Sequence, residues 1–251
     1  MIRLPDRFLA GPIAHRGLHD RASGRPENSI AAFRAAMDRG LAIELDVQPS
    51  LDGVAMAFHD DLLDRLTDTT GPVSARSAEE LAAIPLRDGT AGVPTLADVL
   101  SLVAGRVPLL VEVKDRDGAM GPNIGPLEDA VAAALRSYSG EVALMSFNPH
   151  SVAHLAIAAP HLPRGIVTSA FDPGHWPDLP RATRNRLAAI PDTDRTGASF
   201  ISHEVAALNA PRVAELKAAG LSILCWTVRS PDQAREAMRI ADQITFEGYL
   251  P

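Results

Sequence analysis

Short apolar segments and amphipathic segments alternate along this chain of 251 residues, and the alternation constrains the fold more than any other feature. Segments of strand length that are rich in aliphatic residues occupy 12–17, 41–47, 107–114, 142–147, 164–171, 199–204, 221–228 and 242–248. Strands that alternate with helices pair in parallel. Eight such strands predict an α/β fold, a closed (β/α)8 TIM barrel, with an open doubly wound sheet as the alternative.

Each strand except the last precedes a segment with helix signals, which appear at 28–39, 93–105, 126–137, 149–158, 181–189, 211–219 and 231–241. The first of these helices is expected to begin with Asn28 or Ser29 as its N-cap and to stop at Gly40. No G-x-G-x-x-G follows the first strand, which argues against dinucleotide binding. A barrel commonly has this length as one domain, so residues 1–251 are predicted to form a single domain.

One stretch interrupts the alternation after the second strand. Asp52-Gly53 predicts a two-residue hairpin turn, so the following strand should run antiparallel to the one before it. A turn centred on these two residues places Asp46 opposite His59. Residues 60–90 are mostly polar with a short helix near 77–83, and they are predicted to form a small insertion over the barrel mouth. The charged residues of 64–88 are expected to be its solvated face.

Charged and histidine residues occupy positions in these strands that core residues normally fill. Glu44 and Asp46 share one face of the second strand, because side chains alternate along a strand. Barrel active sites lie at the carboxyl ends of the strands. We therefore expect seven polar groups to meet at that end: His15, Arg16, Glu44, Asp46, His59, Glu112 and Lys114.

Three carboxylates in a partly enclosed space require cations, because unpaired buried charge is costly. Arg16 and Lys114 can neutralise part of the charge of Glu44, Asp46 and Glu112. A hard divalent cation, Mg²⁺ or Ca²⁺, suits these oxygen ligands, and zinc is less favoured because no cysteine joins the cluster.

Two histidines can serve as general acid and general base. His15 and His59 are the candidates, and no serine stands in a G-x-S-x-G setting. A metal together with an arginine and a lysine can stabilise charge on phosphoryl oxygens. The set therefore predicts metal-assisted cleavage of a phosphodiester.

Composition excludes several other classes. The net charge of −7 and the pI near 5.6 argue against a nucleic-acid-binding protein. Cys225 is the single cysteine, so an internal disulfide is excluded. The sequence has neither a signal-like start nor an apolar run of about 18 residues. A cytoplasmic enzyme with a small-molecule substrate and no stable membrane insertion is expected.

Several sequence pieces, in order along nearly the whole chain, resemble the glycerophosphodiester phosphodiesterase family, within the phospholipase-C-like phosphodiesterase superfamily. The pieces are AHRG (14–17), PENSIAAF (26–33), IELDVQ (43–48), DGVAMAFHDDLLDRLT (52–67), VPTLADVL (93–100), VEVK (111–114), SFNP (146–149) and CWTV (225–228). Where the family often ends on Thr-Asp-x-Pro, this chain has TFEGYLP, with Phe246 and Glu247.

The resemblance implies a TIM barrel with a small insertion after the second strand, and an enzyme of lipid metabolism that hydrolyses glycerophosphodiesters to sn-glycerol 3-phosphate and an alcohol. It implies attack of the glycerol 2-hydroxyl on phosphorus, giving a cyclic phosphate that water opens. It also implies roles for the residues found above: Mg²⁺ or Ca²⁺ on Glu44, Asp46 and Glu112, acid–base chemistry by His15 and His59, and phosphate contacts by Arg16 and Lys114.

Two further positions carry open interpretations. Glu27 either orients the histidines or a metal-bound water, or is a carboxylate favoured by a helix N-terminus. Trp226 either walls the mouth against the substrate or packs in the core. Two other functions also stay open: a lysophospholipase D or related phosphodiester lyase, which needs an apolar entry path, and a catalytically silent barrel that binds phosphate metabolites.

Overall fold

The structure, a computed structural model, describes residues 2–251. Its strands are β1 (Ile13–Ala14), β2 (Ala42–Pro49), β3 (Ala55–Ala57), β4 (Leu109–Val113), β5 (Val142–Ser146), β6 (Arg164–Thr168), β7 (Phe200–Glu204), β8 (Ser222–Val228) and β9 (Gln243–Phe246). The strand order is β1-β9-β8-β7-β6-β5-β4-β2-β3, and β1 also pairs with β2. This order closes eight strands into the predicted (β/α)8 barrel, with β3 as an added strand on β2.

The α-helices are α1 (Ile30–Met37), α2 (Ala78–Ala83), α3 (Leu96–Val103), α4 (Pro126–Leu135), α5 (Pro149–Ala158), α6 (Arg181–Ala188), α7 (Thr193–Thr196), α8 (Pro211–Ala218) and α9 (Pro231–Ala237). The eight predicted barrel strands and the helices between them are confirmed, with ends that differ by a few residues. Ser29 is the N-cap of α1, since its Oγ accepts a hydrogen bond from the Ala32 amide at 3.1 Å.

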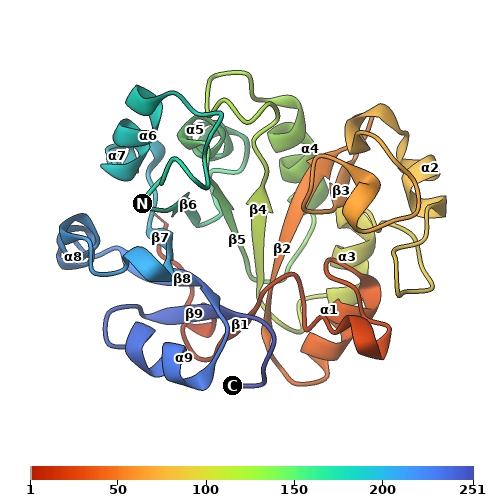
Figure 1. Ribbon diagram of the computed structural model, residues 1–251, viewed down its shortest axis with the longest axis horizontal. Helices are drawn as coiled ribbons and strands as arrows, with labels where there is room; N and C mark the ends of the chain where they lie inside the picture. The colour runs from red at the N-terminus through yellow and green to blue at the C-terminus, as the bar shows by residue number, and fades with distance from the viewer. Residues whose placement is uncertain (1) are drawn as a thin grey trace. The chain divides into compact units, whose positions relative to one another are not determined.

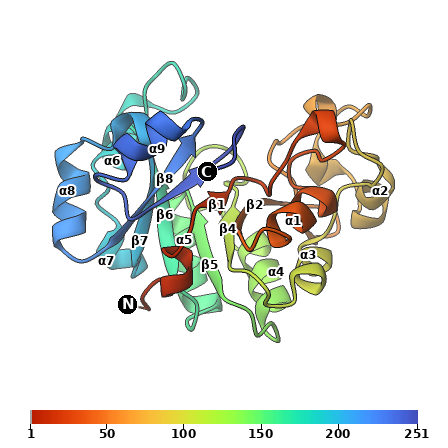
Figure 2. The same cartoon turned by 90° about the horizontal axis from the view of Figure 1, so that it is seen from below.

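The chain forms two compact units. The first unit contains residues 14–114 and 125–142, and the second contains residues 2–13, 115–124 and 143–251. In the first unit β2 lies between β3, which is antiparallel to it, and β4, which is parallel. Helix α1 lies beside α3, and α3 lies beside α4 (Figure 2). The predicted single domain over residues 1–251 stays a prediction.

Residues 60–90 share a hydrophobic core with β3 and with the residues that flank the segment. Figure 1 shows this segment and α2 next to β3. It includes the 3-10 helices η3 (Leu63–Arg65) and η4 (Val73–Ala75). The buried side chains of this core are Met56, Phe58, Leu63, Leu66, Val73, Leu81, Leu86 and Val93. Helix α2 begins with a capping box between Ser77 and Glu80. The location of the insertion over the barrel mouth stays a prediction.

The hairpin register differs from the prediction by one residue. Val47 pairs with Ala57, and the Phe58 amide donates to the Asp46 carbonyl at 3.1 Å, so Phe58 rather than His59 faces Asp46. The reason is a three-residue loop, in which Gly53 adopts φ +80°. Such loops place a left-handed residue before the second strand, which shifts the register that a two-residue turn would give.

The second unit carries the strands β5 to β9. Parallel pairs join β5 to β6, β6 to β7, β7 to β8 and β8 to β9. Helices α8 and α9 pack against β8. Within residues 2–251, no helix combines the length and the apolar character needed to cross a bilayer.

Candidate active site

Three buried carboxylates meet where β2 and β4 pair in the first unit. Glu44 and Asp46 lie on one face of β2, and Asp46 is the neighbour of Glu112 on β4. Their exposed fractions are 2%, 1% and 7%. One oxygen from each lies within 4.8 Å of the others. The predicted clustering of these three residues is therefore present in the structure.

Two cations contact this carboxylate cluster. The Lys114 Nζ donates to Glu112 Oε1 at 2.8 Å and to Asp46 Oδ1 at 3.3 Å. The Arg16 Nε lies 3.3 Å from Asp46 Oδ2, and the Arg16 backbone amide donates to Glu44 Oε2 at 2.9 Å. The two cations bring positive charge to the space that holds the three carboxylates.

The two carboxyls of β2 respond to this environment in opposite ways. Burial, together with the charges of Asp46 and Glu112, raises the pKa of Glu44 well above its usual range. Burial alone would also raise the pKa of Asp46, but Lys114, His59 and Arg16 hold it below the usual range. Glu44 is therefore the carboxyl that takes up a proton when no further cation is present.

The donor set of the cluster suits a hard divalent cation. It offers only carboxylate oxygens from Glu44, Asp46 and Glu112, which Mg²⁺ and Ca²⁺ prefer, whereas zinc favours nitrogen and sulfur donors. Burial, together with the charges of Asp46 and Glu112, raises the pKa of Glu44 and so disfavours its ionised form. A divalent cation would supply positive charge that favours that form.

The turn after β1 brings its backbone against both β2 and α1. Arg16 and Asn28 adopt φ +54° and +53°, a region that residues with a side chain rarely occupy. The backbone N–H of Asn28 donates to the Arg16 carbonyl at 3.0 Å. The Gly17 amide donates to the Glu44 carbonyl at 3.2 Å. Such backbone strain concentrates at functional sites, and here the two hydrogen bonds hold the strained residues next to the carboxylates.

Asn28 is a site residue that the sequence analysis missed, since it was considered only as a helix cap. Its Nδ2 donates to Asp46 Oδ2 at 2.9 Å, and its Oδ1 accepts from the Asp46 amide at 3.2 Å. The side chain is 1% exposed. Asn28 thereby orients the Asp46 carboxylate, and the signal for it was its place in the PEN segment.

Alanine at Gly17 is expected to destabilise the fold by about 2–4 kcal/mol, from left-handed strain plus overpacking. Gly17 has φ +78°, and an added Cβ would lie 2.9 Å from the Ala32 carbonyl carbon. Urea unfolding would measure the loss. Gly40→Ala is the matched control, because Gly40 has φ +67° with no atom within 4 Å of an added Cβ. Equal losses in the two variants would contradict the close approach at Gly17.

Both predicted histidines belong to the first unit. The Nε2 of His15 lies 3.9 Å from Glu44 Oε2. The Nδ1 of His59 lies 2.7 Å from Asp60 Oδ1. His59 contributes to the low pKa of Asp46 even though it is not the cross-strand partner of that residue. The roles of the two histidines in proton transfer stay predictions.

Glu27 is tied to the site by arginines. Its Oε1 accepts from Arg16 Nη1 at 2.5 Å, and its two oxygens accept from Arg65 at 2.8 Å each. Burial opposes ionisation, but these arginines hold the pKa of Glu27 below its usual range. Its contacts are therefore with arginine side chains, and its effect on the histidines stays a prediction.

Trp226 lies on β8 in the second unit. Its indole Nε1 donates to the Ser202 carbonyl at 3.0 Å, and its ring meets Phe147 edge-on at 5.5 Å between centroids. Trp176 and Phe171 complete an aromatic cluster with Phe147. These contacts support the core-packing interpretation of Trp226. A contact between Trp226 and the substrate stays a prediction.

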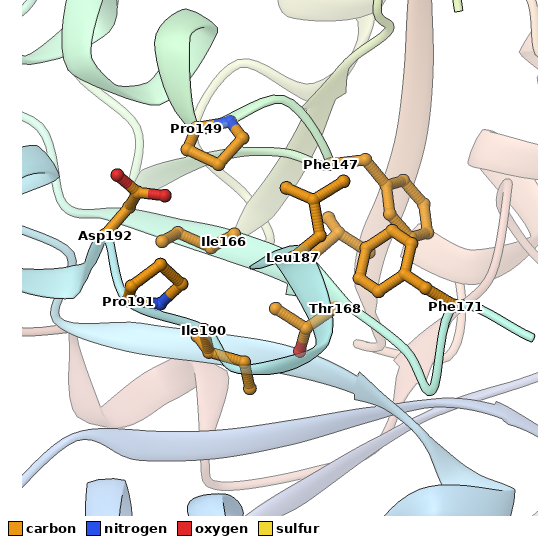
Figure 3. A pocket seen from close by; sticks show the side chains of 10 residues that line it. Phe147, Pro149, Ile166, Thr168, Phe171, Leu187, Ile190, Pro191 and Asp192 are labelled. Atoms are coloured by element: carbon orange, nitrogen blue, oxygen red, sulfur yellow. The ribbon is translucent and has the colours of Figure 1, made fainter. Parts of the chain in front are cut away.

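A small pocket adjoins this aromatic cluster. Figure 3 shows the rings of Phe147 and Phe171 on one side of it, and Pro149, Pro191 and Asp192 on the other. Its volume is about 10 Å³, which corresponds to roughly one water molecule. The pocket is too small for a phosphodiester.

Comparisons with known proteins agree on one family. Residues 15–248 match the model of the glycerophosphoryl diester phosphodiesterase family. A putative glycerophosphodiester phosphodiesterase of Bacillus subtilis is 31% identical over 233 residues, which are 88% of this chain and 87% of that protein. The matched range spans the positions of both histidines and of all three clustered carboxylates.

Solved structures agree with the fold. A phosphodiesterase of Oleispira antarctica, in complex with the product sn-glycerol-3-phosphate, is similar with a TM-score of 0.78 at 24% identity, covering 95% of this chain and 93% of that one. A glycerophosphodiester phosphodiesterase of Agrobacterium tumefaciens has a TM-score of 0.69 at 25% identity, covering 98% and 96%.

Proposed function

Because this chain belongs to the glycerophosphoryl diester phosphodiesterase family, we propose that it hydrolyses glycerophosphodiesters to sn-glycerol 3-phosphate and an alcohol. The observation that carries the proposal is the buried cluster of Glu44, Asp46 and Glu112 with Arg16 and Lys114 bound to it. An anionic phosphodiester needs such cations, and a proton-transfer reaction needs the histidines that the same unit supplies.

A divalent cation, Mg²⁺ or Ca²⁺, is part of the proposal, held by Glu44, Asp46 and Glu112. When bound, it would stabilise negative charge on the phosphoryl oxygens. The burial of the three carboxylates strengthens that interaction, because little water screens them.

The side chains of this site divide the remaining work. Arg16 and Lys114 attract and orient the phosphate. Of His15 and His59, one takes the proton from the attacking 2-hydroxyl of glycerol and the other gives a proton to the leaving alcohol. The two histidines exchange these roles when water opens the cyclic phosphate.

The two alternative functions find less support in the structure. An entry path for an acyl chain would require exposed apolar side chains in the insertion. Leu63 and Leu66 are buried in its core at 0% and 2% exposure, and Leu62, at 49%, is the exposed one of the three. A catalytically silent barrel would be expected to lack a histidine or a carboxylate of the set, and this chain retains all of them.

The test is phosphorus NMR of glycerophosphocholine incubated with metal-stripped protein, before and after Mg²⁺ or Ca²⁺ is added. We expect a glycerol 3-phosphate resonance that appears only with the metal. A panel with other headgroups and lysophosphatidylcholine would follow in the same assay. Absence of turnover across the panel would refute the proposed function, and faster turnover of lysophosphatidylcholine would favour the lysophospholipase D alternative.

A further inference from the structure

Arg65 of the insertion links Glu27 to Asp60, the residue that follows His59. Its Nη1 and Nη2 donate to the two oxygens of Glu27 at 2.8 Å each. Its Nε and Nη2 donate to the two oxygens of Asp60 at 2.6 and 2.9 Å. One guanidinium group thus holds two carboxylates, each by two hydrogen bonds, which is a geometry that fixes position as well as charge.

Each of these carboxylates contacts a predicted active-site side chain. Asp60 Oδ1 lies 2.7 Å from His59 Nδ1, and Glu27 Oε1 accepts from Arg16 Nη1 at 2.5 Å. Arg16 in turn contacts Asp46. The contacts therefore run from His59 through the Arg65 guanidinium to the carboxylate cluster.

The contact with Asp60 selects the tautomer of His59. Burial alone would raise the pKa of Asp60. The hydrogen bonds from His59 and Arg65 outweigh burial and hold that pKa below its usual range, so the carboxylate is ionised. An ionised carboxylate only accepts hydrogen bonds, so the Nδ1 of His59 must carry the proton. The Nε2 of His59 is then the atom left for proton transfer.

Other residues of the insertion hold the backbone at Arg65 in place. The Arg87 Nη1 donates to the Arg65 carbonyl at 2.8 Å, and the Arg87 amide donates to the Leu66 carbonyl at 2.7 Å. Leu63 and Leu66, on either side of Arg65, are buried in the core of the insertion. Arg65 is exposed, as expected for the charged residues of 64–88, and it also contacts Glu27 and Asp60.

We propose that Arg65 is a positioning residue for the phosphodiesterase reaction: through Asp60 it holds His59 with Nδ1 protonated, and through Glu27 it holds Arg16. This inference rests on the proposed function. The Arg65 side chain is 48% exposed, and exposed ion pairs contribute little to stability. The effect of its removal should therefore appear in the reaction rather than in the unfolding temperature.

The test compares Arg65→Ala and Asp60→Asn with the unaltered protein in two measurements. The first is steady-state turnover of glycerophosphocholine with saturating metal. We expect kcat to fall ~10- to 100-fold in both variants, as for other residues that orient a reacting group. Added guanidinium ion should restore part of the activity of Arg65→Ala. Arg65→Lys should not recover it, because an ammonium cannot hold two carboxylates in this geometry.

The second measurement is nitrogen NMR of the His59 ring, assigned by comparison with His59→Gln. The unaltered protein should show a protonated Nδ1, and Arg65→Ala should shift the population toward the Nε2-protonated tautomer. Arg21→Ala is the matched control, since Arg21 pairs with Asp88 at an exposed site. It should change neither measurement.

Unchanged kcat in Arg65→Ala, or an unchanged His59 tautomer, would overturn the proposal. An unaltered protein that turns over no phosphodiester would instead refute the proposed function, and the tautomer measurement would still test the contact between Arg65, Asp60 and His59.

Discussion

Alanine at His15 or at His59 is expected to lower kcat by roughly 10²- to 10⁴-fold, the range that general acid–base catalysis contributes. KM should change far less, because Arg16 and Lys114 keep their contacts with the carboxylates in either variant. The double variant should lose less than the product of the two single losses, since both histidines serve one proton-transfer sequence.

Steady-state kinetics with glycerophosphocholine and a saturating divalent metal would measure both effects. His161→Ala is the control, because that residue is exposed in the turn after α5. A substrate with an aryl leaving group separates the two roles. Such a leaving group needs no proton, so the variant that lacks the general acid should recover most of its rate. Full activity of a variant toward both substrates would show that the substituted histidine takes no part in proton transfer.

Side-chain alternation along β2 and β4 was sufficient to predict the carboxylate cluster. Glu44 and Asp46 occupy one parity of a strand, and parallel pairing then brings Glu112 beside Asp46. The choice of barrel over open sheet followed from the number of strand–helix units. These features depend on periodicity, which a sequence displays directly.

Features that depend on single backbone conformations could not be predicted in the same way. Asp52-Gly53 suits both a two-residue turn and the end of a three-residue loop, and only the observed φ of Gly53 shows which one forms. Asn28 was considered as a cap, but its left-handed conformation aims its amide at Asp46. Arg65 was missed because no local pattern marks a side chain that contacts Glu27, 38 positions away.

The metal-free protein is expected to lose stability as pH rises, and bound metal should remove that loss. The pKa of Glu44 is raised in the folded protein relative to an exposed glutamate, because the group is buried beside Asp46 and Glu112. The folded state therefore holds a proton that the unfolded chain has released. Its contribution to stability is present at acid pH and disappears as pH rises through the raised pKa. A divalent cation replaces that proton and restores the balance of charge.

Thermal unfolding with and without Ca²⁺ or Mg²⁺ would test this linkage. At one fixed metal concentration, chosen as about 100 Kd at about pH 8, binding adds about 2.7 kcal/mol at that pH, or roughly 5–10 °C in Tm for a chain of this size. The gain in Tm should be larger at about pH 8 than at about pH 6, and calorimetry should detect proton release on binding. A gain that is the same at both pH values would contradict proton displacement from Glu44.

Glu44→Gln separates the stability of the fold from metal binding, because the two should move in opposite directions. The amide resembles the protonated glutamate, and its oxygen can still accept from the Arg16 amide, so the metal-free Tm at about pH 8 should rise. Metal affinity and kcat should both fall by about 10²-fold or more, since an anionic ligand is lost. Glu128→Gln is the control: Glu128 is also buried, at 3% exposure, but it accepts from the Gly125 amide at the start of α4. If Glu44→Gln instead lowered the metal-free Tm, Glu44 would be a structural carboxylate, and the cation site would have to be sought without it.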